Sequence, residues 1–414
     1  MKYLVLCPDG AADWPIEALG GRTPLEAARL PNLSRLAREG LVGRTLHVPP
    51  GMDNGSDICC MSLLGFDPAR YHTGRAPLEA KSLGVDLAGD DVAVRCNTVT
   101  IRDGVMTDYS AGHIATPESR QLIEALDRAL GRDGRRFYPG KQYRHLLVLR
   151  RPGGLKAECT PPHNITGRPV AGQLPRGPDA PLLQELMDAS APVFAGHPVN
   201  KARLARGELP ATQVWLWGHG LRPRLPVFRD TYGLTGALIS AVDLMRSLGL
   251  YLGLDVLEVP GITGFVDTDY AAKGRYALQA LDRHGLVFIH VEAPDECGHI
   301  DDPRRKTEAL ERIDAEIVGP IVSSPPARAG QLRILVCPDH ATPCALKTHA
   351  TEPVPFLAWG PGFPAGGQGF TEADARRSAV EVMPGHALLG RFLAGELTGG
   401  NEKEKGEGRR KKDG

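Results

Sequence analysis

The stretch RILVCPDHATP, residues 333–343, joins a short apolar run to an acid and a histidine, and it indicates how the chain folds. An apolar run of this length, bounded by proline, is typical of a strand buried on both faces of a sheet. Asp339 and His340 follow the run directly. Two interpretations are open: a loop that turns after a strand, or a pair of metal ligands at the carboxyl edge of a parallel sheet.

Two further apolar runs end in the same way. KYLVLC, residues 2–7, is followed closely by Asp9, and LVFIHVEAP, residues 286–294, is followed by Asp295. In open parallel sheets the carboxyl ends of the strands form the ligand crevice. We therefore expect the three acids to meet at one edge of a sheet.

Helical patterns between these runs predict that the sheet is mostly parallel. Residues 306–322 carry an apolar stripe at helical spacing, so strand, helix and strand form a βαβ unit. GALISAVDLMRSLGL, residues 236–250, predicts a further helix. Residues 32–40 predict a helix with Asn32 as N-cap and Gly40 as its end. The fold class is thus α/β, a mostly parallel sheet core flanked by helices.

The middle of the chain has a different pattern, which indicates a second domain. Residues 92–101 and 143–150 alternate apolar and polar side chains, as in a sheet with one solvent-exposed face. Residues 116–131 predict an amphipathic helix. We expect a smaller α+β domain inserted into the core. The expected boundaries are residues 1–86 and 206–398 for the core, 87–205 for the inserted domain, and 399–414 for a disordered charged tail.

Composition restricts the class of function. Lys plus Arg and Asp plus Glu both total 49, so the net charge is zero and neither a nucleic acid nor a membrane surface is the expected partner. No apolar stretch has the length of a membrane span or signal peptide. The eight cysteines form no CxxC pair, which favours a reduced, cytoplasmic protein. No pattern indicates an oligomeric state.

A set of acids and histidines suggests a metal centre. Carboxylate and imidazole groups together suit Mn²⁺, Zn²⁺ or Mg²⁺. The set is large enough for two ions, and two adjacent ions suit phosphoryl transfer. Taken singly, each residue has an ordinary explanation, such as a turn-forming acid or a hydrogen-bonded loop histidine. The members are Asp9, Asp295, His299, Asp339, His340 and His349.

Ser56, in GMDNGSDICCMSLLG, is the candidate nucleophile. It follows a Gly/Asn/Asp turn and precedes a helix-like run, so free backbone N–H groups can hold phosphate oxygens beside it. The alternative is a plain N-cap serine. Ser62 is a weaker candidate because it falls inside the same helix. YPGKQ, residues 138–142, is not a Walker motif, and no nucleotide-binding fingerprint is present. We therefore expect no nucleotide, with the phosphate supplied by the substrate.

These residues carry a family resemblance. The chain resembles the archaeal-type cofactor-independent phosphoglycerate mutases of the alkaline phosphatase superfamily, over nearly its whole length except the tail. The stretches that match are PDGAADWPIEALGGRTPLEAARLPNLSRLAREG, GSDICCMSLLGFDPARYHTGRAPLEAKSLGV, DYSAGHIAT, FYPGKQYRHLLV, HPVNKAR, VEAPDECGHIDD, PDHATP and THATEPVPF.

The resemblance implies an alkaline-phosphatase-like core, two divalent ions and a phosphoserine intermediate. The enzyme would interconvert 3-phosphoglycerate and 2-phosphoglycerate, in glycolysis and gluconeogenesis, without 2,3-bisphosphoglycerate. Ser56 would carry the phosphoryl group between the two hydroxyls. The implied ligands are Asp9, Ser56, Asp339 and His340 for one ion and Asp295, His299 and His349 for the other.

The resemblance also implies basic groups that hold a small phosphorylated carboxylic acid. Each candidate taken alone has a second explanation as a solvated surface group. WLWGHG, residues 215–220, resembles instead a subgroup proposed to be homoserine kinases, so a phosphotransferase or phosphatase acting on another small phosphoester is the alternative. The candidates are Arg75, His113, Arg144, His145, His163, Lys201, Arg222 and Arg224.

Overall fold

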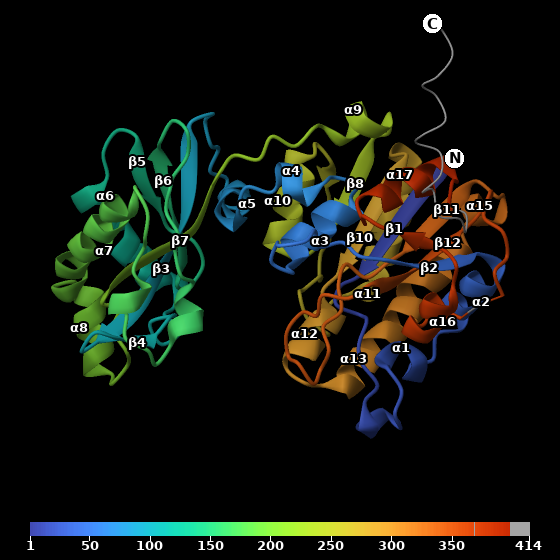
Figure 1. Ribbon diagram of the computed structural model, residues 1–414, viewed down its shortest axis with the longest axis horizontal. Helices are drawn as coiled ribbons and strands as arrows, with labels where there is room; N and C mark the ends of the chain where they lie inside the picture. The colour runs from blue at the N-terminus through green and yellow to red at the C-terminus, as the bar shows by residue number, and fades with distance from the viewer. Residues whose placement is uncertain (368, 398–414) are drawn as a thin grey trace, which may run out of the picture. The chain divides into compact units, whose positions relative to one another are not determined.

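The computed structural model describes residues 1–367 and 369–397, and it divides into two compact units (Figure 1). Unit 1 holds Met1–His72 and the chain from Leu225 onward, and unit 2 holds Thr73–Arg224. The expected tail, residues 399–414, lies outside the described residues.

Unit 1 is built on one eight-stranded sheet with the strand order β13-β2-β12-β11-β1-β10-β8-β9. β1 pairs in parallel with both β10 and β11, and β10 pairs in parallel with β8. β12 is antiparallel to both of its neighbours. The strands are β1 (Lys2–Pro8), β2 (Leu41–Thr45), β8 (Gly236–Ile239), β9 (Asp255–Val256), β10 (Leu286–Val291), β11 (Leu332–Val336), β12 (Val354–Trp359) and β13 (Glu381–Val382).

Helices cover both faces of this sheet (Figure 1). In β1, Leu4 and Leu6 pack with α2, α11 and α13, whereas Val5 and Cys7 pack with α3, α10 and α17. The helices are α1 (Pro24–Ala27), α2 (Pro31–Glu39), α3 (Ser56–Leu63), α4 (Pro68–Tyr71), α9 (Phe228–Tyr232), α10 (Asp243–Tyr251), α11 (Tyr270–Arg283), α12 (Ala293–His299), α13 (Pro303–Arg312), α14 (Gly319–Val322), α15 (Pro325–Arg328), α16 (Glu372–Arg377) and α17 (Ala387–Ala394), with the 3-10 helix η1 (Glu17–Leu19) and the π-helix η4 (Ile313–Val318).

Unit 2 is an antiparallel sheet with its own core. β3 is central and pairs with β4, β6 and β7, and β5 pairs with β6. The strands are β3 (Asp91–Arg102), β4 (Val105–Asp108), β5 (Arg135–Tyr138), β6 (Arg144–Arg150) and β7 (Gln213–Leu221); the helices are α5 (Arg75–Ser82), α6 (Thr116–Leu130), α7 (Ala180–Ala195) and α8 (Pro198–Ala205), with short turns η2 (Pro162–Ile165) and η3 (Ala171–Gln173).

The predicted fold class is confirmed, with differences in detail. Unit 2 extends beyond the expected residues 87–205 at both ends, because α5 packs on β3 and β7 completes the sheet beside it. The expected solvent-exposed face of that sheet is covered, since Ala76 and Ala80 of α5 pack against Ala93 and Leu146. Alternation of apolar and polar residues along a strand does not show whether a helix from another part of the chain covers its polar face.

Two local predictions for unit 1 were wrong. The helix expected over residues 236–250 begins at Asp243, because β8 pairs with β10 before it. Asn32 is not the N-cap of α2, which begins at Pro31. Asp314, distant in sequence, caps this helix instead: its carboxylate accepts the backbone N–H groups of Asn32 at 3.1 Å and Leu33 at 2.7 Å.

No helix within residues 1–367 and 369–397 is long and apolar enough to cross a membrane.

We expect Asp314→Ala to lower the free energy of unfolding of unit 1 by about 2 kcal/mol, because buried N–H groups at the start of α2 lose their acceptor. Guanidinium chloride denaturation measures this change. Asp282→Ala, at an exposed position of α11, is the matched control and is expected to change the value little. Equal losses in the two variants would contradict the capping role.

Candidate active site

Three buried carboxylates gather beyond the carboxyl ends of neighbouring strands. Asp9 follows β1, Asp339 follows β11, and Asp295 lies in α12 directly after β10. Because β1 runs parallel to both neighbours, these ends share one edge of the sheet. The side chains of all three residues are nearly inaccessible to solvent.

The first group of possible ligands, triad A, consists of Asp9, Asp339 and His340, whose ligand atoms lie within 4.8 Å of one another. His340 Nε2 lies 3.3 Å from Asp339 Oδ2 and 3.5 Å from Asp9 Oδ1. Asp339 Oδ1 accepts the backbone N–H groups of Gly10 and His340, at 3.2 and 3.0 Å, which fixes the carboxylate in place. Ser56 Oγ lies 3.2 Å from His340 Nε2.

The second group, triad B, consists of Asp295, His299 and His349. His299 is four residues after Asp295 in α12, so the two side chains lie on one helix face, and His299 Nε2 is 3.2 Å from Asp295 Oδ2. His349 Nε2 is 3.5 Å from Asp295 Oδ1. The rings of His349 and His340 stack with their centroids 3.8 Å apart, so the two triads are adjacent.

Hydrogen bonds orient the imidazoles of triad B as metal ligands require. His299 Nδ1 donates to the carbonyl of Lys347 at 3.0 Å, and His349 Nδ1 donates to the carbonyl of Asn54 at 2.6 Å. Each ring therefore presents Nε2 toward Asp295. A backbone acceptor on the far nitrogen is the usual support for a metal-bound histidine.

The electrostatics of triad A also fit a bound cation. Burial raises the pKa of Asp9 well above its usual value, and the nearby carboxylates of Asp339 and Glu292 raise it further. Burial, followed by the charge of Asp295, raises the pKa of Glu292 to about 8. Asp9 Oδ1 is buried without a hydrogen-bond partner among the described residues. A buried, unpaired acceptor beside several acids is the arrangement that a divalent cation stabilises.

Ser56 is the first residue of α3, after Gly55 in extended conformation. It is partly exposed, whereas the rest of α3 is buried, so the hydroxyl is accessible at the helix start. Ser62 lies inside α3, fully buried, with its Oγ 3.2 Å from His47 Nδ1. The geometry therefore favours Ser56 over Ser62 as nucleophile.

Sequence reasoning missed two supporting residues. His290 Nε2 donates to Asp9 Oδ2 at 2.8 Å, and Thr342 Oγ1 donates to Asp295 Oδ1 at 2.5 Å. His290 lies inside an apolar run, and its approach to Asp9 depends on the pairing of β1 with β10. Thr342 falls within the opening stretch, two residues after His340, and this proximity was the one available signal.

Three of the predicted substrate-binding residues gather within unit 2. Burial lowers the pKa of His163, and the neighbouring guanidinium groups of Arg95 and Arg75 lower it further. Arg95 stacks on Trp217 at 4.0 Å, and Arg144 lies over Tyr143 at 4.9 Å. The ring of Tyr109 contacts Tyr143 and His163, and the ring of His163 contacts Trp217, so the two pairs are linked. We name this the arginine–aromatic cluster: Arg75, Arg95, Tyr109, Tyr143, Arg144, His163 and Trp217.

The other predicted substrate-binding residues of unit 2 lie outside this cluster. His145 is buried in β6, where Nδ1 accepts the N–H of Gly140 at 3.0 Å and burial lowers its pKa to about 3, so the structure favours a packing role for it. The remaining side chains are exposed, and none makes a hydrogen bond or ion pair within the described part of the chain. They are His113, Lys201, Arg222 and Arg224.

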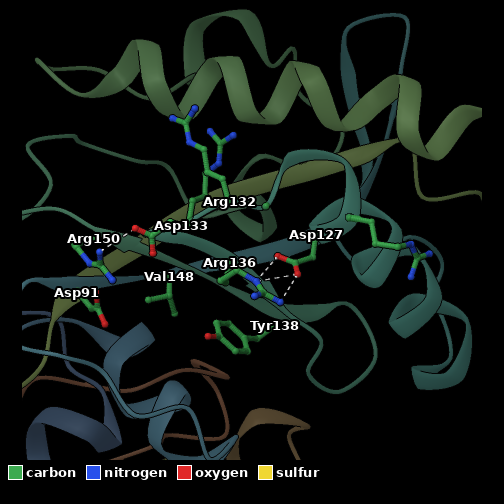
Figure 2. Close-up of a pocket in the computed structure, with 12 residues that line it drawn as sticks. Asp91, Asp127, Arg132, Asp133, Arg136, Tyr138, Val148 and Arg150 are labelled. Carbon is green, nitrogen blue, oxygen red and sulfur yellow. Dashed lines mark hydrogen bonds and ion pairs between the residues drawn. The ribbon is translucent and has the colours of Figure 1, made fainter.

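A separate cavity of about 580 Å³ lies elsewhere in unit 2, and none of the predicted site residues lines it. Figure 2 shows Arg136 beside Asp127 and Arg150 beside Asp133, in ion pairs of 2.8 and 3.3 Å. These pairs offset two of the five arginines that line it. No residue of triad A or triad B lines this cavity, so its size does not make it the reaction site.

Comparisons with known proteins agree with this geometry. A profile of the 2,3-bisphosphoglycerate-independent phosphoglycerate mutase family matches residues 37–200. A Methanothrix thermoacetophila protein of that name is 46% identical, covering 95% of this chain and 100% of the relative. A Geobacter sulfurreducens protein named a probable member is 47% identical, over 95% of this chain and all of its own.

Two solved structures extend the likeness to the fold. A Pyrococcus horikoshii protein superposes with a TM-score of 0.81 at 26% identity, covering 96% of this chain and 99% of its own. The cofactor-independent phosphoglycerate mutase from Thermoplasma acidophilum gives a TM-score of 0.68 at 26% identity, covering 96% of this chain and 100% of its own. Together with the two triads, this similarity implies divalent metal ions.

We expect metal binding at pH 8 to release protons from the protein. The hydrogen bond from His299 to Asp295 raises the pKa of the imidazole to about 9 in the metal-free protein, whereas a metal ligand must be neutral. Metal affinity is therefore expected to rise with pH until about 9, and proton release to disappear above it. Titration calorimetry with Mn²⁺ in two buffers of different ionisation enthalpy measures the release.

His299→Asn is expected to release fewer protons than the wild type, since asparagine carries none to lose. His386→Asn, outside both triads, is the matched control and keeps the wild-type release. Equal heats in the two buffers for the wild type would show that His299 is already neutral or does not bind the ion.

Proposed function

We propose that this chain, which belongs to the family of 2,3-bisphosphoglycerate-independent phosphoglycerate mutases, interconverts 3-phosphoglycerate and 2-phosphoglycerate through a phosphoserine at Ser56. It is then an isomerase of glycolysis and gluconeogenesis that needs neither a nucleotide nor 2,3-bisphosphoglycerate. The observation that carries the proposal is the position of the Ser56 hydroxyl, 3.2 Å from His340 in triad A.

Two divalent ions complete the proposed site, and Mn²⁺, Mg²⁺ or Zn²⁺ suits its ligands. Triad A with Ser56 holds one ion, and triad B holds the other. When bound, the ions neutralise charge on the phosphoryl group and lower the pKa of the serine hydroxyl. The unpaired Asp9 Oδ1 and the Nε2 atoms of triad B, which point toward Asp295, support this assignment.

In the proposed reaction the phosphoryl group is transferred in two steps, first to Ser56 and then back to glycerate. Ser56 Oγ attacks the phosphorus, the bond from phosphorus to the 3-oxygen of the substrate breaks, and the departing oxygen gains a proton as Ser56 loses one. The 2-hydroxyl of glycerate then attacks the phosphoserine and restores Ser56. Ser56 is the first residue of α3, and the positive end of the helix dipole there favours the negative charge of a phosphate.

The arginine–aromatic cluster of unit 2 is the proposed holder of the substrate carboxylate. Arg144 is backed by Tyr143, and its guanidinium is a planar donor suited to a carboxylate. Arg95 is backed by Trp217, but its Nε already donates to Glu79 at 3.1 Å, so its role is to add positive charge to the cluster. The charge of three neighbouring arginines is large for one small region. Glu79, which pairs with Arg95 at 3.0 Å, offsets one of these charges.

The homoserine alternative uses the same serine and ions, so the triads do not separate it from the mutase. The named relatives favour the mutase.

A cytoplasmic location is part of the proposal and is supported by the eight free cysteines.

We expect Ser56→Ala to lower mutase activity by at least about a thousandfold, the scale of loss when an enzyme's nucleophile is removed. The assay contains 3-phosphoglycerate, Mn²⁺ and enolase, without 2,3-bisphosphoglycerate, and follows phosphoenolpyruvate. Mn²⁺ affinity should fall far less, because triad A and triad B remain.

Ser34→Ala, within α2, is the matched control and is expected to keep wild-type activity. Turnover that persists in Ser56→Ala would refute the phosphoserine. A wild-type protein loaded with metal but unable to form phosphoenolpyruvate would refute the mutase and favour the homoserine alternative.

We expect Arg75→Gln to raise KM for 3-phosphoglycerate by at least about tenfold, because a charge-assisted hydrogen bond to the substrate is lost. Arg102→Gln removes an equal charge from an exposed position of unit 2 outside the cluster. Steady-state kinetics of both variants measure the difference. Equal KM values would exclude Arg75 from substrate binding.

A further inference from the structure

Two thiols and an imidazole lie together beside triad A. The thiols have no part in the proposed reaction, whereas the imidazole of His290 also holds Asp9. Cys7 Sγ, Cys60 Sγ and a ring nitrogen of His290 lie within 4.8 Å of one another. All three residues have no exposed surface. Two thiols and an imidazole are a different donor set from the carboxylate-rich triads.

Three separate elements bring these donors together. The parallel register of β1 and β10 pairs Cys7 with His290, so their side chains point to the same face of the sheet. α3 packs over that face and supplies Cys60 beside Cys7. The three donors are close together because of strand register and helix packing, and local sequence spacing does not predict their proximity.

The group also contacts the carboxylates of triad A. Cys60 Sγ donates to Asp339 Oδ2 at 3.4 Å, and His290 Nε2 donates to Asp9 Oδ2 at 2.8 Å. An oxygen is thus within reach as a fourth ligand, which would complete the tetrahedral set that Zn²⁺ prefers.

We propose that Cys7, Cys60 and His290 form a site for a thiophilic divalent cation such as Zn²⁺ or Cd²⁺. Thiolate and imidazole ligands select such ions over Mg²⁺ and Mn²⁺, which prefer oxygen. On binding, each thiol releases one proton to solvent and the sulfurs bond to the ion as thiolates. The neutral imidazole donates the lone pair of one ring nitrogen to the ion and gives up the hydrogen bond of that nitrogen, which is to Asp9 for Nε2 or to Ser240 Oγ, 3.2 Å away, for Nδ1. No electron is transferred.

Binding of an ion at this site is expected to be coupled to the binding of an ion at triad A. The ion takes Cys60 away from Asp339 and changes the surroundings of His290, which holds Asp9. A thiophilic ion here is therefore expected to weaken Mn²⁺ binding at triad A. Mn²⁺ at triad A is expected to weaken binding of the thiophilic ion by the same factor.

The test is a Cd²⁺ titration of the reduced full-length protein in excess Mg²⁺, followed by the ultraviolet absorption of cadmium–thiolate charge transfer. Triads A and B contain no sulfur, so an ion held by their own ligands does not give this band. The wild type is expected to reach saturation at one ion per chain. Cys7→Ser and Cys60→Ser should each weaken Cd²⁺ binding by at least about tenfold. Cys96→Ser, buried in the core of unit 2, is the matched control and should bind as the wild type does.

X-ray absorption at the zinc edge gives a second reading on the wild type, independent of the folding of any variant. Sulfur ligands at about 2.3 Å together with nitrogen at about 2.0–2.1 Å are expected for one Zn²⁺ bound in excess Mg²⁺. A shell of oxygen and nitrogen alone would overturn the proposal. So would a cadmium–thiolate band of unchanged strength in the folded Cys7→Ser/Cys60→Ser double variant.

Discussion

Burial of negative charge at one edge of a parallel sheet is the constraint on which the rest of unit 1 depends. Asp9, Asp295 and Asp339 are nearly inaccessible to solvent, and buried carboxylates this close repel one another. Such a group is stable when each acid is held by donors and when a cation offsets their charge. Backbone N–H groups hold Asp339, and the imidazoles of His290 and His299 hold the other two acids.

The sheet satisfies this constraint through its topology. A strand with parallel neighbours on both sides brings three chain segments, far apart in sequence, to one edge. Cores on both faces hold β1 rigidly, so Asp9 is set by the same packing that stabilises the unit. The same register places Cys7 beside His290, which is why a sulfur-containing group lies directly under the acids.

The parts of the fold that could be predicted are those with a local signal. Continuous apolar runs identified β1, β10 and β11, and the acids after them marked the edge where they meet. β8 was missed because a four-residue strand before a helix has no pattern of its own, and its state depends on pairing with β10. The ends of unit 2 were missed because β7 reaches β3 across more than a hundred residues.

The residues of the candidate site also divide into those with a local sequence signal and those that depend on tertiary contacts. Residue type and position were enough to select all members of triads A and B, whereas His290 and Thr342 depend on tertiary contacts. In unit 2, the pairing of Arg95 with Trp217 across β3 and β7 assembles the arginine–aromatic cluster, and no sequence spacing reveals that register.

The most direct measurement is anomalous X-ray diffraction at the manganese edge from crystals of the protein grown with Mn²⁺. The arrangement of the acids and imidazoles predicts two neighbouring anomalous peaks, one bound by Asp9, Asp339 and His340 and the other by Asp295, His299 and His349. A map without peaks at these residues, from crystals shown to contain Mn²⁺, would contradict the assignment of the buried acids to a two-ion phosphotransfer centre.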